Sequence, residues 1–166
     1  MTEDPEKKRA YILYVTACER RNQGDEVGAM KAITEALVIR PKNALYVFSK
    51  GLIEWEFDHL NAAIASLSTA ARMRPQWDDP IAALASIAYD AELYQVAKKL
   101  YQHAVGLKPN ANKYTILANI CLNEDPAEAL RYSELALALE PDWEEAINLR
   151  ADALKKLAER AEGDGR

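Results

Sequence analysis

Small and apolar residues recur along the chain at three- and four-residue intervals, with charged residues between them, as in amphipathic helices. Ala, Leu, Glu, Lys and Arg dominate these stretches, and all five are good helix formers. No stretch alternates β-branched and polar residues between turn signals, as a half-buried strand would. The pattern predicts an all-α protein.

Four series of residues repeat along the chain with a shared period of 32 to 34 positions. They are the small residues Ala17, Gly51, Ala85, Ala118 and Ala151, the alanines Ala29, Ala63, Ala97 and Ala129, the alanines Ala36, Ala70, Ala104 and Ala136, and the prolines Pro41, Pro75, Pro109 and Pro141. Proline ends a helix because its ring clashes with the preceding turn and it lacks an N–H. Small residues on facing helices let the two axes approach to about 8 Å. The series therefore predict successive antiparallel helix pairs, each closed by a proline.

The repeated residues resemble the tetratricopeptide repeat (TPR) family, whose unit is a helix-turn-helix of about 34 residues. The first unit matches the family most fully, through Leu13, Ala17, Gly24, Asp25, Ala29, Ile33, Ala36 and Pro41. The resemblance implies a right-handed α-solenoid of four TPR units followed by a C-terminal capping helix, about nine helices in all.

The expected boundaries follow the repeat. The units are residues 9–42, 43–76, 77–110 and 111–142, the capping helix is 143–160, and the tails are 1–8 and 161–166. Polar residues just after the closing prolines predict helix N-caps at Asn43, Asp78 and Asn112.

A stronger helix start lies in the fourth unit. Asp125 is followed by proline and, three residues on, by Glu128, which predicts an N-cap and a capping box. Trp77 and Trp143 each lie two residues after a closing proline, and we expect them to staple one helix onto the next rather than to bind a ligand.

In a TPR stack, as the resemblance implies, the first helix of each unit lines a concave groove. Helical periodicity then indicates which side chains face this groove. The candidate binding residues are Tyr11, Tyr14, Cys18, Phe48, Ser49, Leu52, Trp55, Asp79, Ser86, Tyr89 and Asn119. The five large apolar residues among them, in the first two units, would form a patch of the kind that marks a binding site. We expect a non-enzymatic interaction module that holds an apolar peptide or helix of a partner protein.

Other interpretations of the same residues remain open. Leu45 and Trp55 could pack against the adjoining repeat as ordinary core. A chaperone similar to those that shield apolar translocator segments in secretion, or a self-associating scaffold, are alternative functions.

One known TPR groove is excluded by residue type. Co-chaperones that hold the C-terminal carboxylate of heat-shock chaperones need Lys, Arg and Asn in the groove. The corresponding positions here are Tyr14, Cys18, Ser49, Asp79 and Ala83. Without a cation there, an acidic C-terminus is not the expected ligand.

Composition and motifs exclude several other classes. The chain carries 21 Lys and Arg against 26 Asp and Glu, a net charge of -5, which argues against nucleic-acid binding. No apolar run approaches the roughly 20 residues of a membrane span, and the N-terminus lacks an apolar signal region, so we expect a cytoplasmic protein. No phosphate loop or metal-binding motif occurs, and His59 and His103 lie in different units, so we expect no catalytic residue, cofactor or metal. Cys18 and Cys121 lie three repeats apart and should be reduced thiols.

Overall fold

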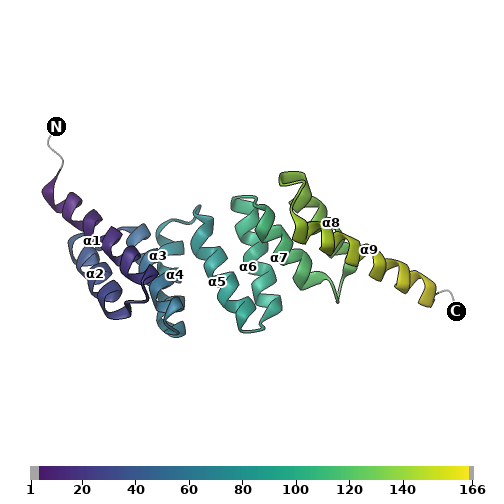
Figure 1. The fold of residues 1–166 in the computed structure, drawn as a ribbon, viewed down its shortest axis with the longest axis horizontal. Coiled ribbons are helices and arrows are strands. Elements are labelled where there is room, and N and C mark those ends of the chain that lie inside the picture. Colours follow the sequence, from purple (N-terminus) through teal and green to yellow (C-terminus); the bar gives the residue numbers. More distant parts are fainter. Residues whose placement is uncertain (1–3, 165–166) are drawn as a thin grey trace. The chain divides into compact units, whose positions relative to one another are not determined.

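The structure is a computed structural model that describes residues 4–164. Over this range the backbone forms nine α-helices and no strand, which confirms the predicted all-α repeat (Figure 1). The helices are α1 (Pro5–Asn22), α2 (Glu26–Ile39), α3 (Ala44–Glu56), α4 (Leu60–Met73), α5 (Asp78–Asp90), α6 (Tyr94–Leu107), α7 (Ala111–Cys121), α8 (Pro126–Leu139) and α9 (Glu144–Asp164).

The helices fall into two compact units that divide within α5, after Leu84. In the first unit α1 packs against α2, α3 packs against α4, and α2 also contacts α3. In the second unit α7 packs against α8, α9 packs against both of them, and α6 contacts α7. Each unit has its own buried core, in which alanines from paired helices meet larger apolar side chains.

The small-residue series occupy the contacts between paired helices. Every alanine in the two series of the second helices is completely buried. Gly51 shows why bulk is excluded, because a Cβ added there would lie 2.8 Å from the Leu67 Cγ atom and 3.2 Å from the Leu67 backbone nitrogen. Side chains larger than this space allows would force α3 and α4 apart.

The helix starts confirm some predicted caps and correct others. Asn43 accepts a hydrogen bond from the Leu45 backbone N–H at 3.0 Å and caps α3 as predicted. Asn112 is not a cap but lies inside the first turn of α7, and Asp78 is the first residue of α5. Asn110 caps α7 instead, since its side chain accepts from the Lys113 N–H at 3.2 Å.

The two end helices extend further than the repeat boundaries imply. The predicted tail 1–8 is helical from Pro5, because the side chain of Asp4 caps the helix and proline at the first helical position suits its geometry. At the other end α9 continues past the predicted residue 160 to Asp164. Residues 1–3 and 165–166 of the predicted tails lie outside the described range.

A buried polar cluster links the two helices of the second repeat. Glu54 on α3 is only 3% exposed, yet it forms an ion pair with Lys50 and accepts a hydrogen bond from the Ser66 hydroxyl of α4 at 2.6 Å. A buried carboxylate is tolerated only when such partners compensate its lost hydration.

A second network connects α6, α7 and α8 and corrects the predicted capping box. Asp125 caps α8 by accepting from the Glu128 N–H at 3.0 Å, but the Glu128 carboxylate does not return to the cap. It pairs with Lys98 of α6 and accepts a hydrogen bond from the Cys121 thiol of α7 at 3.4 Å. The inter-helix partners outcompete the local bond because they neutralise a half-buried charge.

These contacts shift the pKa of every member of the network. Burial, together with the hydrogen bond to Glu128, raises the pKa of Cys121 to about 11. Burial also opposes ionisation of Glu128, but the bonds from Lys98 and Cys121 outweigh it and lower the pKa of that carboxyl. The same bond raises the pKa of Lys98. The thiol is therefore held protonated and the ion pair held charged near neutral pH.

Replacing Gly51 by alanine should destabilise the fold by about 1–2 kcal/mol, because the new methyl group overpacks the α3–α4 contact. The matched control is Gly106→Ala, at a helical position of α6 where an added Cβ meets nothing within 4 Å. There the change should stabilise by about 0.5 kcal/mol, since alanine has the higher helix propensity. Urea unfolding of both variants measures the difference, and a Gly51→Ala protein as stable as the wild type would contradict close packing at this site.

The raised pKa of Cys121 predicts a pH-dependent loss of stability. In the unfolded chain this thiol ionises near its ordinary value of 9.0, but in the folded chain only near 11, so the unfolded state loses the proton first. The contribution is fully present below pH 9 and is lost as the pH rises through 11. In a Cys18→Ala background, unfolding free energy should therefore fall more steeply above pH 9 than in the Cys18→Ala, Cys121→Ser protein.

The same shift can be measured chemically. The two pKa units between 9.0 and about 11 leave about 100-fold less thiolate than in an unfolded chain at pH 8, so iodoacetamide should react slowly with native Cys121. Equal alkylation rates in native and denatured Cys18→Ala protein at that pH would be inconsistent with the network.

Candidate functional site

The exposed face of α1 carries two tyrosines that the sequence placed in the groove. Tyr11 and Tyr14 are three residues apart, so they share one helix face, and their ring centroids lie 6.1 Å apart. Tyr14 stacks on Tyr46 of α3, with centroids 5.1 Å apart and ring planes 18° from parallel. Tyr46 is buried, whereas Tyr11 is 59% exposed. The stack therefore fixes Tyr14 against α3 and leaves Tyr11 open to solvent.

Cys18 and Ser49 lie beside the Tyr14 hydroxyl. Burial raises the pKa of Tyr14, the neighbouring Cys18 raises it further, and a hydrogen bond with Ser49 opposes the shift. Ser49 is itself only 5% exposed, while Cys18 is half-buried. The structure thus brings these three predicted residues together, but Ser49 serves to hold the tyrosine and has almost no surface of its own.

The other predicted apolar residues of the first unit lie on α3. Phe48 packs edge-on against Trp77, with ring centroids 4.7 Å apart, and the Trp77 indole N–H donates to the Asp79 carboxylate at 2.7 Å. Leu52 and Trp55 are half-buried, as is Phe48. Trp77 therefore contacts two predicted site residues, Phe48 and Asp79. The sequence had predicted for Trp77 only a packing role between successive helices.

The alternative interpretation of Leu45 has direct support in the structure. Leu45 is half-buried and packs against the buried core of the first unit, which includes Ile33 and Ile53.

In the second unit Tyr89 and Asn119 form one contact. The Asn119 side-chain N–H donates to the Tyr89 hydroxyl at 3.0 Å, and the Tyr89 ring meets Tyr94 edge-on at 5.6 Å. Ser86, the third predicted residue there, hydrogen-bonds the Tyr101 hydroxyl at 2.7 Å. Burial raises the pKa of Tyr101, and the Ser86 bond opposes that shift. A pocket of about 300 Å³ adjoins this contact and is lined by Tyr89, Tyr94, Asn119, Ile120, Asn123 and Glu124.

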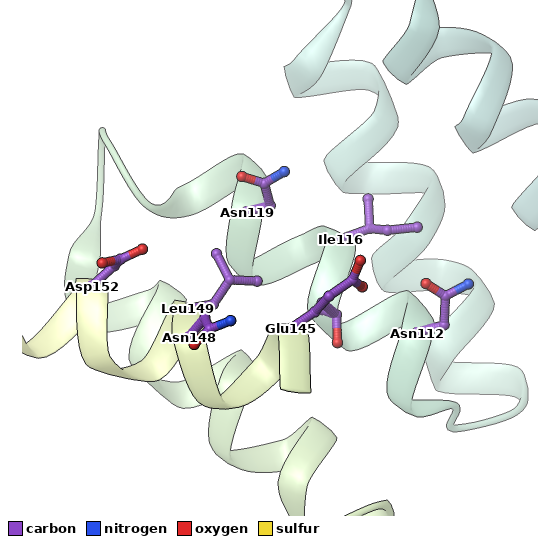
Figure 2. A pocket seen from close by; sticks show the side chains of 8 residues that line it. Asn112, Ile116, Asn119, Glu145, Asn148, Leu149 and Asp152 are labelled. Carbon is purple, nitrogen blue, oxygen red and sulfur yellow. The ribbon is translucent and has the colours of Figure 1, made fainter. Parts of the chain in front are cut away.

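A larger pocket of about 460 Å³ lies between α7 and α9. Figure 2 shows side chains of the two helices converging on it from opposite sides. The pocket is lined by Asn112, Thr115, Ile116, Asn119, Glu145, Asn148, Leu149 and Asp152. Asn119 borders both this pocket and the smaller one.

The four lining residues of α9 are absent from the sequence-based site because that helix was interpreted as a polar cap. The repeat contains the signal that would have found them. The small-residue series steps by 33 from Ala118 to Ala151, and the same step carries Asn112 to Glu145 and Asn119 to Asp152. The two helices therefore present corresponding positions to one pocket.

Between residues 4 and 164 no three His, Cys, Asp or Glu side chains cluster as metal ligands. His59 contacts Glu26 at 2.6 Å on the surface, His103 is exposed, and both cysteines are free thiols. None of the helices in this range is long and apolar enough to span a membrane.

Comparison with solved structures identifies the fold. A tetratricopeptide repeat protein from Parabacteroides merdae is 15% identical, with a TM-score of 0.79, over 92% of this chain and 61% of that one. PilF of Pseudomonas aeruginosa is 17% identical, with a TM-score of 0.80, over 94% of this chain and 72% of that one. The first TPR domain of Spaghetti (RPAP3), bound to the HSP90 peptide SRMEEVD, is 16% identical, with a TM-score of 0.64, over 70% and 94% of the two chains.

Comparison of the sequence alone gives no such match. No family model matches it, and no curated protein does. The similarity is thus one of fold.

Proposed function

We propose that this chain, which has the tetratricopeptide repeat fold, is a non-enzymatic module that binds an apolar segment of a partner protein. The observation that carries the proposal is that aromatic side chains on α1 and α3 are only partly buried. Tyr11 is 59% exposed, and Phe48 and Trp55 are only half-buried. Large aromatic rings held at a surface are the usual anchors of protein–protein contacts.

The supporting contacts make these rings suitable anchors. Tyr14 is stacked on buried Tyr46, and Phe48 is packed against Trp77, so both are ordered before a ligand arrives. A preorganised surface loses less side-chain entropy on binding. Burial of about 500 Å² of apolar surface would contribute roughly 12 kcal/mol, against an association cost of about 4–15 kcal/mol. A dissociation constant on the order of 1 µM is the expected result.

The nature of the ligand differs from that of the Spaghetti domain, which is solved with the HSP90 peptide SRMEEVD. The positions that correspond to a carboxylate-binding groove hold Tyr14, Cys18 and Ser49 in the first two repeats, and Asp79 and Ala83 in the third. None of these can neutralise a C-terminal carboxylate, and Asp79 would repel it. Free Cys18 and Cys121 fit a reducing compartment such as the cytoplasm.

Selection from a library of twelve-residue peptides should therefore enrich sequences rich in Leu, Ile, Phe and Trp. A Tyr11→Glu, Phe48→Glu variant should bind the selected peptides at least about tenfold more weakly, because it places charge among the anchors. Fluorescence anisotropy with a labelled peptide measures the change.

The matched control is Val38→Glu, which adds a carboxylate at an exposed position of α2, away from the first-helix face. It should bind like the wild type. If the folded double variant, verified by circular dichroism, keeps full affinity for every selected peptide, the binding face is assigned wrongly.

A further inference from the structure

The pocket between α7 and α9 differs chemically from the aromatic face of the first unit. Of its eight lining residues, three are asparagines, two are carboxylates and none is a cation. Glu145 and Asp152 are exposed, and within residues 4–164 neither takes part in an ion pair. The pocket therefore presents two carboxylates without an ion-pair partner, in a hollow large enough for a ligand side chain.

The amide groups of the pocket are available as well. Asn112 and Asn148 are exposed and make no side-chain hydrogen bond within the described range, and Asn119 uses one N–H for Tyr89. Asparagine is a poorer helix former than alanine, so Asn119 and Asn148 within helices do not serve helix stability. A side-chain amide both donates and accepts, as a peptide backbone does, so these groups match an extended main chain.

The floor of the pocket is apolar. Ile116 and Leu149 are half-buried and face the hollow from α7 and α9, as Figure 2 shows. Thr115 is buried, and its hydroxyl donates to the Ala111 carbonyl at 2.9 Å, so it offers no free donor. An aliphatic floor beneath carboxylates suits lysine and arginine, which lay their methylene stems on apolar surface while the charged head pairs with an acid.

One cation of α9 is engaged away from the pocket. Arg160, two turns beyond Asp152 on α9, donates to the backbone carbonyls of Asn123 at 2.8 Å and Glu124 at 3.4 Å. Its guanidinium thus serves the loop between α7 and α8. Arg160 consequently does not form an ion pair with the carboxylates of the pocket.

We propose that this pocket binds an extended peptide segment carrying two basic side chains, with arginine preferred because its planar group pairs with a carboxylate through two hydrogen bonds. Glu145 and Asp152 are seven residues apart on α9, which corresponds to a rise of about 10 Å. In an extended chain of polyproline II conformation, which has three residues per turn and rises about 3.1 Å per residue, positions three apart lie on the same face and are separated by about 9 Å. The ligand is therefore a segment with cations at i and i+3, whose main chain contacts the asparagines.

This inference rests on the proposed function in one respect, the use of first-helix surfaces for ligands, but it concerns a separate ligand and a separate unit. Variants of α9 leave the aromatic face of the first unit untouched. The apolar peptides selected above should bind the α9 variants with unchanged affinity. A failure of either proposal is thus visible without a failure of the other.

The test uses the full chain and a labelled twelve-residue peptide of Ala, Ser and Gln with arginines at two positions three apart. Anisotropy titration should give a dissociation constant on the order of 10 µM at about 50 mM salt, weakening at about 200 mM salt. Glu145→Gln with Asp152→Gln should weaken binding at least about tenfold. Asn148→Leu should weaken it several-fold while leaving the salt dependence unchanged, because it removes backbone hydrogen bonds and no charge.

The matched control is Glu134→Gln with Glu140→Gln, which removes two exposed carboxylates from the α8 region and alters the net charge equally. It should retain the wild-type affinity. Glu145→Lys with Asp152→Lys should reverse the preference, so that the peptide with glutamates in place of arginines binds instead. Equal weakening by the control pair, or equal binding of both peptides by the wild type, would overturn the proposal.

Discussion

The spacing of paired helices is set by small side chains, and the rest of the structure depends on that spacing. At Gly51 the space left for a Cβ is already taken by Leu67, and the alanines at the corresponding contacts of the second helices are fully buried. Close approach fixes the rotation of each helix about its axis, because only one face carries residues small enough to meet its partner. Once that face is fixed, the direction of every other side chain follows from helical periodicity.

Polar groups then secure the packed helices at points where the apolar contact alone would not define register. Glu54 with Lys50 and Ser66 links α3 to α4, and Glu128 with Lys98 links α8 to α6. Each carboxylate gains several partners in a partly dehydrated place, where an unpartnered charge would be costly. Such clusters favour one alignment over neighbouring alternatives with similar apolar burial.

Much of the fold follows from the sequence, since small residues and prolines at a fixed period can be recognised without side-chain coordinates. The period also gives the faces, which is why Tyr11, Tyr14 and Cys18 were expected together and lie together. The period does not predict the rotamer of a side chain or the residues of other segments that the side chain contacts. The burial of Ser49 and the contact of Phe48 with Trp77 depend on side chains of other segments.

Choices between competing hydrogen bonds are equally hidden from sequence patterns. Asn110 and Asn112 are both good caps by residue type, and the backbone turn decides for Asn110. Glu128 has a local and a distant partner of similar chemistry, and the distant lysine prevails. The pocket residues of α9 were overlooked for a different reason, because a polar helix at the end of an array looks like a solvated cap whether or not its side chains converge on a neighbour.

Inward-facing alanines pack the helices together, whereas outward-facing residues are available to contact a ligand. This separation has an evolutionary consequence. The residues that hold the helices together lie on the packed faces, so substitutions on the solvent-facing helix surface leave the architecture intact. One unit can therefore display rings at Tyr11 and Phe48 while the other displays amides and acids at Asn148 and Asp152. Binding specificity in such a chain can change through substitutions on one helix at a time, while the fold is retained.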